Sequence, residues 1–370
     1  MLKLFEVEGF KNFPHTFSIN FSDVRDYRFN ENCIKGDMLK DIIIYGKNST
    51  GKSNFGLAVF DIVAHLTANN VSPGLYDNYI NIANGKGEAV FHYVFQFGTD
   101  IIDYTYEKSS NKALTFERLT LNDALIMQKD YESSQQDLSG LTKLAPTLNY
   151  AFNTDGSLLK YALNNIALES EHPLYKMMVF VSKILWFRNL DENRYIGYKS
   201  NAEDYLTFML EDATILDEFQ HLLKLAGVDD TIYVGTDSDG KKRLYSAPSY
   251  DVLGRIPFFS AASSGTKALY AFFYWYKTAP DTSLMFIDEF DAYYHYELSE
   301  TIVKLLGDMP NTQVILTSHN TNLLSNRIMR PDCYFILTRD SLTSFANATD
   351  RELREGHNLE KLYMSGEFYG

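Results

Sequence analysis

The residues with the clearest chemical capability lie between Gly46 and Ser53, which read G-x-x-x-x-G-K-S. This pattern is typical of a loop that binds nucleotide phosphates. The glycines permit a tight turn with inward-facing amide hydrogens, and Lys52 reaches the β and γ phosphates. The hydroxyl of Ser53 is a ligand for Mg²⁺. The residues that we expect to bind the nucleotide are Gly46, Asn48, Ser49, Thr50, Gly51, Lys52, Ser53 and Asn54.

A phosphate loop also needs a carboxylate for the metal and a base for the attacking water. Asp288 and Glu289 supply both at the end of an apolar run, 284–287, within the stretch SLMFIDEFDAYYH. We expect Asp288 to hold Mg²⁺, mostly through water, and Glu289 to polarise the attacking water. An acidic loop after a strand is the structural alternative, and the phosphate loop earlier in the chain favours the catalytic interpretation.

Two further stretches place polar residues at the ends of expected elements. His319 follows an apolar run at 314–316 that reads as a buried strand, and there it would sense the γ-phosphate. A lone histidine is more often a structural residue. Ser263, Ser264 and Gly265 precede an aromatic-rich helical run, and such a helix start can bind an anion. The alternative for this stretch is an ordinary serine N-cap.

The elements around these residues must bring them to one place. Residues 42–45 form a β-branched and aromatic run typical of a buried parallel strand, and the apolar residues after Ser53 recur at helical spacing. Strand, glycine loop and helix is the order that a phosphate loop requires. A parallel strand alongside the loop strand would present Asp288 and Glu289 at its carboxyl end, where ligands bind in open α/β sheets. His319 would then come from the adjacent strand.

The rest of the chain predicts antiparallel strands and a helical segment. Residues 91–122 alternate like antiparallel strands, and residues 123 to about 225 look mainly helical. Residues 231–248 read as a hairpin, in which D-S-D-G is turn chemistry rather than a metal site. The W-F-R run at 186–188 could stack on a ligand, but core packing is the simpler interpretation.

The composition limits the classes of protein that fit. The 370 residues carry a formal charge of -14, with a sequence pI near 5.0, so no global field attracts nucleic acid or an anionic membrane. The two cysteines, Cys33 and Cys333, match no metal-binding spacing, which fits a reducing compartment. No signal-peptide core and no apolar stretch of membrane-spanning length occurs. We therefore expect a cytoplasmic protein without membrane contact.

Taken in order, the motifs resemble those of the ABC-type ATPases of the SMC/RecF class. GKNSTGKS corresponds to the Walker A loop, SSGTK to the signature, LMFIDE to Walker B, and the histidine of TSHN to the switch. The opening FEVEGFKNFPHTFSINF also resembles the first strands of that class. Within it, the chain is similar to the stand-alone prokaryotic AAA15/AAA21 ATPases, such as the RloA/AbiL-like proteins and the ATPase half of OLD-family defence proteins. The likeness covers roughly residues 1–115 and 250–370.

The resemblance implies an α/β fold: an ABC-type ATPase head with a mixed sheet, an antiparallel β subdomain and a helical insertion. It divides the chain into an N-terminal ATPase lobe at 1–122, a mainly helical insertion with a hairpin at 123–250, and a C-terminal ATPase lobe at 251–370. ATP and Mg²⁺ are the implied cofactors, and ATP hydrolysis is the implied reaction.

The same resemblance implies a homodimer, or a higher even oligomer, with ATP at the interface. Ser264 and Gly265 would contact the γ-phosphate held by the other subunit, and Asp291 falls at the position of the family's D-loop. The signature departs from the common L-S-G-G-Q at its first and last two positions, which weakens its specificity. The sequence does not place the family's Q-loop. Gln96 is a candidate for its glutamine, although a glutamine in a strand is more often structural.

Three functions remain open. The first is an ATPase that controls a separate effector protein, such as a nuclease, in antiphage defence or a toxin–antitoxin system. The second is a RecF-like DNA-repair ATPase, which the acidic balance and the short insertion without sustained heptads do not favour. The third is a transporter engine, for which the signature is atypical. A small GTPase is disfavoured because the guanine motif N-K-x-D does not occur.

Overall fold

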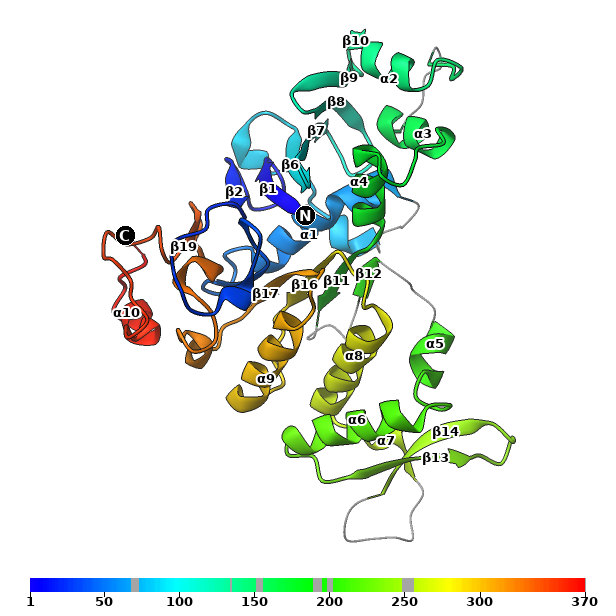
Figure 1. Ribbon diagram of the computed structural model, residues 1–370, viewed down its shortest axis with the longest axis vertical. Coiled ribbons are helices and arrows are strands. Elements are labelled where there is room, and N and C mark those ends of the chain that lie inside the picture. The colour runs from blue at the N-terminus through cyan, green and yellow to red at the C-terminus, as the bar shows by residue number, and fades with distance from the viewer. Residues whose placement is uncertain are drawn as a thin grey trace.

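The computed structural model of this chain describes residues 1–67, 73–133, 135–150, 156–188, 195–197, 202–247 and 256–369. Figure 1 shows an elongated molecule with an antiparallel sheet at the top, a mainly parallel sheet in the middle and a small hairpin layer at the bottom. The α/β fold with a mixed sheet and an antiparallel β subdomain is thereby confirmed. Within the described part of the chain, no helix combines the length and apolar character that a membrane crossing requires.

The central sheet has the strand order β12-β11-β16-β17-β5-β18-β19, in which the pairs from β11 to β18 are parallel and the two edge pairs are antiparallel. Its inner strands are buried on both faces, which explains their continuous apolar sequences. The strands are β5 (Asp41–Tyr45), β11 (Ile184–Arg188), β12 (Tyr195–Gly197), β16 (Leu284–Asp288), β17 (Gln313–Thr317), β18 (Tyr334–Leu337) and β19 (Leu342–Ser344).

One expectation about this sheet was wrong. The strand that ends in Asp288 does not lie alongside the loop strand, because β17 is inserted between β16 and β5 and pairs with both. The strand before His319 is therefore the central one of the three. The carboxyl ends of these parallel strands still meet at one edge of the sheet.

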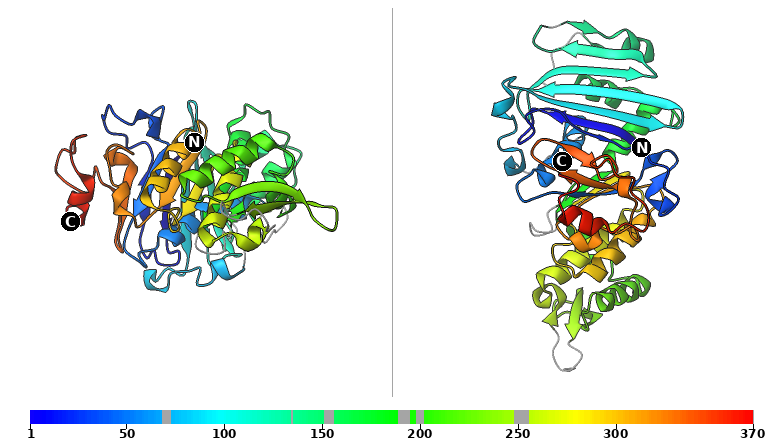
Figure 2. Two further views of the ribbon diagram at one scale, coloured as in Figure 1. Left: turned by 90° about the horizontal axis from the view of Figure 1, so that it is seen from below. Right: turned by 90° about the vertical axis from the view of Figure 1, so that its left-hand side faces the viewer.

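The antiparallel sheet has the order β10-β9-β8-β7-β6-β1-β2, and its strands lie side by side at the top of the right-hand view in Figure 2. Burial alternates along β6 and β7, as expected for a sheet with one face on the core. The strands are β1 (Leu2–Glu8), β2 (Phe17–Asn20), β6 (Ala89–Phe97), β7 (Asp100–Lys108), β8 (Leu114–Leu121), β9 (Ala124–Asp130) and β10 (Gln136–Asp137). The antiparallel strands predicted at 91–122 are confirmed.

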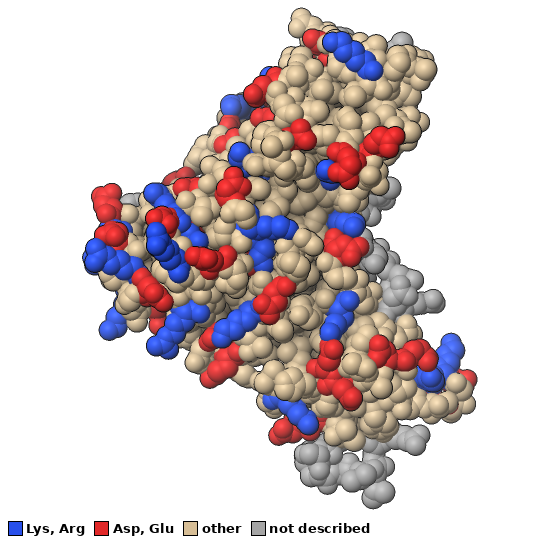
Figure 3. Space-filling view, viewed as in Figure 1, with Lys and Arg blue, Asp and Glu red and all other residues tan. Residues whose placement is uncertain are grey.

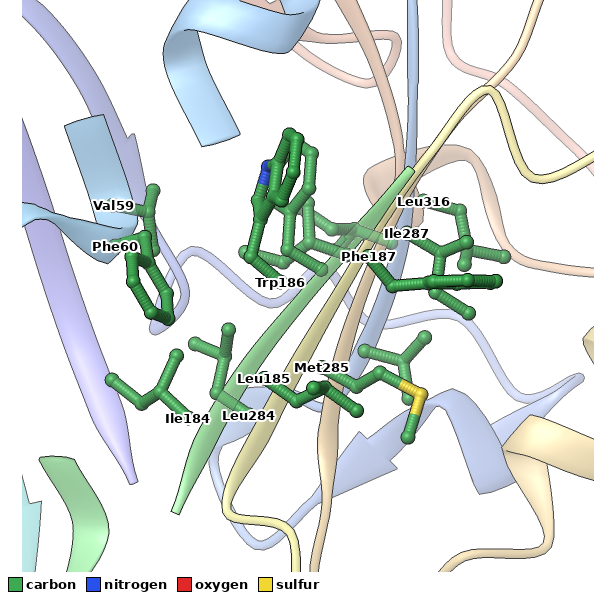
Figure 4. Packing of buried hydrophobic residues seen from close by; sticks show 14 of the residues in the cluster. Val59, Phe60, Ile184, Leu185, Trp186, Phe187, Leu284, Met285, Ile287 and Leu316 are labelled. Atoms are coloured by element: carbon green, nitrogen blue, oxygen red, sulfur yellow. The ribbon is translucent and has the colours of Figure 1, made fainter. Parts of the chain in front are cut away.

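Helix α1 (Lys52–Leu66) lies between the two sheets. Figure 4 shows Val59 and Phe60 of α1 on the side of β11 from which Trp186 extends. On its other side, α1 accepts a hydrogen bond at the carbonyl of Ala58 from the hydroxyl of Tyr93, at 2.9 Å. The helix that carries the phosphate loop is therefore held by both sheets.

The remaining helices surround this core. Helix α6 packs on α8 through Phe219 and Phe273, whose ring centroids are 5.3 Å apart. The longer helices are α3 (Leu158–Asn165), α4 (Pro173–Ser182), α6 (Ala213–Leu225), α8 (Ser264–Thr278) and α9 (Tyr296–Gly307). The shorter ones are α2 (Ser139–Leu144), α5 (Ala202–Thr207), α7 (Phe258–Ala261) and α10 (Leu359–Met364). The short 3-10 helices are η1 (Glu31–Cys33), η2 (Pro73–Tyr76), η3 (Ile82–Asn84), η4 (Thr321–Leu323) and η5 (Pro331–Cys333).

The expectation of a mainly helical segment at 123–225 was wrong in part. Strands β9 and β10 continue the antiparallel sheet past residue 122, and β11 belongs to the central sheet beside β16. Apolar runs as short as that of β11 do not distinguish a buried strand from a buried helix by periodicity. Trp186 and Phe187 lie in the core, as the simpler interpretation held.

The hairpin predicted at 231–248 is confirmed as β13 (Thr231–Thr236) and β14 (Lys242–Ala247), which pair with the short β15 (Ile256–Pro257). Its two tip carboxylates, Asp237 and Asp239, both pair with Arg243, and the Asp239 side chain accepts from the amide of Lys241. These contacts are turn chemistry, and no cluster with metal-binding composition occurs among the described residues. A second small ribbon joins β3 (Ile34–Lys35) and β4 (Met38–Leu39).

Candidate functional site

The phosphate loop connects β5 to α1, as the sequence predicts. Two of its residues, Ser49 and Gly51, have positive φ angles of 64° and 108°. A Cβ atom at Gly51 would also lie 2.0 Å from Nδ2 of the Asn12 side chain, so a side chain there would displace Asn12. The second glycine of the motif is therefore required by both its dihedral angle and its neighbour.

Asn12, in the turn between β1 and β2, holds the loop in place. Its Nδ2 donates to the carbonyl of Thr50 at 2.8 Å, and its Oδ1 accepts from Nδ2 of Asn54 at 2.8 Å. The residue lies within the opening stretch whose resemblance to the ATPase class was noted, but the sequence alone assigned it no role. No local pattern reveals this contact, since Asn12 and Thr50 are 38 positions apart.

Lys52 and His319 face each other across the loop. Lys52 is buried, and its Nζ donates to the carbonyl of Gly46 at 2.9 Å and lies 2.8 Å from Nε2 of His319. Burial lowers the pKa of the Lys52 ammonium. Burial also lowers the pKa of His319, and the charge of Lys52 lowers it further. A neutral His319 can accept the lysine hydrogen at Nε2 and keep its Nδ1 hydrogen for another acceptor.

Asp288 is the last residue of β16 and Glu289 follows it, and both residues contact Thr317, at the end of β17. The Thr317 hydroxyl donates to Oδ1 of Asp288 at 2.7 Å and accepts from the amide of Glu289 at 2.7 Å. Glu289 has a φ of 49°, a strained conformation that costs about 1–3 kcal/mol in a residue with a side chain. The contact from the Glu289 amide to Thr317 helps to hold this conformation.

Burial raises the pKa of the Glu289 carboxyl, and the negative charge of Asp288 raises it further. The Oε2 atom of Glu289 is buried and has no hydrogen-bond partner among the described residues. A carboxylate with a raised pKa and an unused oxygen atom is suited to accept a proton from water.

A cavity of about 510 Å³ connects these groups, which is within the range of small-molecule sites. It is lined by Asn12, Asn48, Ser49, Gly51, Lys52, Ser53, Asn54, Arg188, Glu289 and His319. Most of the predicted loop residues, the predicted base and the predicted sensor thus meet at one cavity. Gly46 and Thr50 do not line it, and Asp288 is fully buried beside it.

Core packing, the simpler interpretation for the run at 186–188, was wrong for Arg188, which is 31% exposed and belongs to the site. Arg188 ends β11, and the register of the parallel pair sets it opposite Asp288. Its Nε lies 3.3 Å from Oδ2 of Asp288, and its side chain lines the cavity. The missed signal was available, because Arg188 follows the short apolar run 184–187 just as Asp288 and His319 follow theirs.

The residues suited to a metal are Ser53 and Asp288. Mg²⁺ prefers oxygen ligands, and it is commonly held by one or two carboxylates together with phosphate oxygens and water. Oδ2 of Asp288 is buried and accepts no hydrogen bond within the described part of the chain, while Ser53 lines the cavity. This donor set fits Mg²⁺.

The signature residues lie apart from this cavity. Ser263 is the N-cap of α8, where its Oγ accepts a hydrogen bond from the amide of Thr266 at 3.1 Å. The ordinary serine N-cap, given above as the alternative to an anion site, is therefore present. Ser263 and Ser264 are exposed, and a Cβ atom at Gly265 would lie 3.3 Å from the carbonyl of Tyr293. None of these residues lines the cavity, and within the described structure none makes a hydrogen bond to the phosphate loop of the same chain.

The two remaining candidates have structural partners. Asp291 is largely buried and accepts at Oδ2 from the hydroxyl of Ser318 at 2.7 Å. Gln96 lies at the end of β6, where its Nε2 donates to the carbonyl of Gly98 at 3.3 Å, and it is not among the residues that line the cavity. Arg188, rather than Gln96, is the residue that reaches the cavity from a neighbouring strand.

Comparison with known proteins identifies a family. Residues 42–325 match the model of the AAA_21 family, described as "AAA domain, putative AbiEii toxin, Type IV TA system". The matched range includes every motif from the phosphate loop to His319. None of the curated proteins matches the chain.

Solved structures of Smc heads are similar to the chain at low sequence identity. The Smc head bound to the C-terminal winged-helix domain of ScpA has a TM-score of 0.46 and 14% identity, covering 93% of this chain and 97% of that one. The SMC head domain from Thermotoga maritima has a TM-score of 0.44 and 15% identity, covering 93% and 98%. An Smc head with an extended coiled coil, bound to the C-terminal domain of ScpA from Pyrococcus furiosus, has a TM-score of 0.44 and 14% identity, covering 92% and 95%.

Proposed function

This chain belongs to the AAA_21 family of AAA domains, and from that premise we propose that it binds ATP with Mg²⁺ at the cavity beside the phosphate loop and hydrolyses it. The observation that carries the proposal is the convergence of Lys52, Glu289 and His319 on one cavity. They come from the start of α1 and from the ends of β16 and β17, three segments that are far apart in the sequence.

The residues divide the work by their chemistry. The loop amides and Lys52 bind the phosphates, and His319 donates a hydrogen bond to the terminal phosphate. Ser53 and Asp288 hold Mg²⁺, which when bound neutralises charge on the phosphate oxygens. Glu289 accepts a proton from the attacking water, at a carboxyl whose pKa is raised by burial.

The first test separates binding from hydrolysis. Lys52→Ala should lose nucleotide binding, because the loop then has no cation for the phosphates. Glu289→Gln should bind ATP and hydrolyse it at least about 100-fold more slowly, because the amide cannot accept the proton. Glu297→Gln, at an exposed glutamate near the start of α9, is the matched control and should behave as wild type. Hydrolysis at the wild-type rate by Glu289→Gln would show that another group is the base.

The proposal includes a homodimer, or a higher even oligomer, with ATP at the interface. Exposure of Ser263 and Ser264, and the separation of this segment from the cavity of its own chain, support a role toward the nucleotide of a second subunit. Ser264→Arg should leave ATP binding intact and abolish both ATP-dependent dimerisation and fast hydrolysis. Sedimentation of Glu289→Gln with and without ATP supplies the reference for the dimer. Normal hydrolysis by monomeric Ser264→Arg would contradict this part of the proposal.

We further propose that the ATPase controls a separate effector protein, such as a nuclease, in antiphage defence or a toxin–antitoxin system. The family description supports the toxin–antitoxin context. We expect the effector to dock on residues 123–225, the part not required for the nucleotide site, with the exception of β11, which belongs to the central sheet. Helices α2 and α3 of that segment lie at the top of Figure 1, beside the antiparallel sheet and away from the central one.

A RecF-like protein that binds DNA itself is the alternative. On the face shown in Figure 3, acidic and basic side chains are interspersed, which does not favour a phosphate backbone as partner. Purification of the chain with its neighbouring gene products, compared with Lys52→Ala, tests the effector. Cleavage of nucleic acid by the chain alone would exclude a separate nuclease.

A further inference from the structure

Arg188 occupies a fixed place next to the carboxylate that is suited to hold the metal. Strands β11 and β16 are parallel neighbours, and their register pairs Arg188 with Asp288. The two residues before Arg188, Trp186 and Phe187, are buried in the core. The backbone of Arg188 is therefore anchored, and its side chain, which is 31% exposed, is the part that can move.

The contact between Arg188 and Asp288 is a charge contact without a hydrogen bond. Nε of Arg188 and Oδ2 of Asp288 are 3.3 Å apart, yet both atoms are without a hydrogen-bond partner among the described residues. The other carboxylate oxygen, Oδ1, is held by the hydroxyl of Thr317. Of the ion pairs within the described structure, this is the only one that Asp288 makes. The guanidinium therefore places its positive charge beside Asp288, and its Nε donor is unused among the described residues.

A cation on Asp288 and the guanidinium would compete for the same oxygen atom and would repel each other at that distance. The guanidinium lines the same cavity as Lys52, and its planar set of donors matches the oxygen atoms of a phosphate. We propose that Arg188 is a metal-released arginine: it pairs with Asp288 until a divalent cation takes that carboxylate, and it then binds a phosphate of the nucleotide. This inference rests on the proposed binding of ATP with Mg²⁺ at the cavity.

The proposal predicts that Arg188 contributes to binding only when the cation is present. Arg188→Gln should weaken the affinity for ATP in Mg²⁺ by about tenfold or more, the loss expected for a hydrogen bond to a charged group. In EDTA the same substitution should change the affinity for ATP by less than about threefold, because the arginine is then held by Asp288. Titration calorimetry measures both affinities without using hydrolysis.

The matched control is Arg354→Gln, which removes the same charge at an exposed site where Arg354 pairs with Glu352. It should leave both affinities unchanged and so accounts for the change in net charge. Arg188→Lys keeps the charge contact to Asp288 and loses the planar donor set, and it should show the same selective loss in Mg²⁺. This variant carries the test if Arg188→Gln does not fold.

A double-mutant cycle with Asp288→Asn tests the release directly, in EDTA. Asparagine carries no charge to retain the guanidinium, so in Asp288→Asn the arginine is free to bind a phosphate without metal. The gain in ATP affinity caused by Asp288→Asn should therefore be about tenfold larger when Arg188 is present than when it is replaced by glutamine. An equal gain in both backgrounds, or an equal loss of affinity in Mg²⁺ and EDTA for Arg188→Gln, would overturn the inference while leaving the proposed function in place. Absence of ATP binding by the wild type under both conditions would overturn the two together.

Discussion

The carboxylate of Asp61 is the place where a single substitution should most clearly weaken the attachment of α1 to the antiparallel sheet. Asp61 has no exposed surface, and it accepts hydrogen bonds from the hydroxyls of Tyr79 at 2.8 Å and Tyr106 at 2.9 Å and from the ammonium of Lys108. Lys108 is 4% exposed. Replacement of Asp61 by asparagine keeps the shape of the side chain and leaves the lysine charge buried without its counter-ion.

The expected cost follows from these contacts. Removal of one partner of a buried ion pair typically costs about 3–5 kcal/mol, most of it from the charge that remains. Nζ of Lys108 lies 5.1 Å from the ring centre of Tyr106, 5.8 Å from that of Tyr79 and 5.9 Å from that of Phe91. These ring faces retain about 1–2 kcal/mol of cation stabilisation in a desolvated site. We therefore expect Asp61→Asn to lower the free energy of unfolding by about 3 kcal/mol, near the lower limit of the range.

Chemical denaturation of wild type, Asp61→Asn, Lys108→Met and the double variant measures this cost. The effect of Asp61→Asn should be clearly smaller in the Lys108→Met background, because no buried cation is then left unpaired. Glu300→Gln removes a carboxylate from the exposed pair with Lys304 and should cost less than about 0.5 kcal/mol. A loss below about 1 kcal/mol for Asp61→Asn, or the same loss in both lysine backgrounds, would refute the reasoning.

Three further outcomes follow from single contacts. Gly56→Ala should lower the free energy of unfolding by about 1–3 kcal/mol, because its Cβ atom would lie 2.4 Å from the Phe286 ring, and thermal unfolding measures this loss. Gly356→Ala is the control and should not lower the free energy of unfolding, because no atom lies within 4 Å of its Cβ position. Thr317→Val should slow ATP hydrolysis by about tenfold or more with little change in ATP affinity, since its hydroxyl positions both carboxylate residues after β16. Burial raises the pKa of Asp41 to about 7, so wild-type stability should fall as pH rises from about 4 to 7, and Asp41→Asn should remove up to about 4 kcal/mol of this dependence.

The sequence predicted those parts of the site in which a functional residue comes directly after, or within a few residues of, the strand that positions it. A buried apolar run followed by a polar residue predicted β5 with its loop, β16 with Asp288 and Glu289, and β17 with His319. The reason is physical: parallel strands buried on both faces need continuous apolar residues, and ligands bind where such strands end. These signals lie within a few neighbouring residues and do not depend on the rest of the fold.

The parts that were missed depend on pairing between distant segments. The sequence of a single strand does not specify the order of β16, β17 and β5 in the sheet, because each of the three apolar runs could pair with either of the others. Arg188 entered the site because β11 pairs with β16, whereas the run 184–187 lies in a segment that looks mainly helical from the sequence, and periodicity alone does not distinguish a short buried strand from a buried helix. Asn12 contacts the loop through a turn whose position is fixed by the antiparallel sheet.

The attachment of α1 on both sides also limits where a response to nucleotide can occur. Gly56 lets the helix approach Phe286 of the central sheet, and Asp61 attaches the helix to the antiparallel sheet through Tyr106 and Lys108 of β7. A helix fixed in this way holds Lys52 in one place, so the free energy of phosphate binding is not spent on moving the helix. Arg188 and His319 line the cavity and have exposed surface, so their side chains are able to rearrange. Asp61→Asn should therefore lower the free energy of unfolding and leave the effect of Arg188→Gln on ATP affinity unchanged. Arg188→Gln should still weaken ATP binding in Mg²⁺ and not in EDTA, because the two substitutions act on separate sets of contacts.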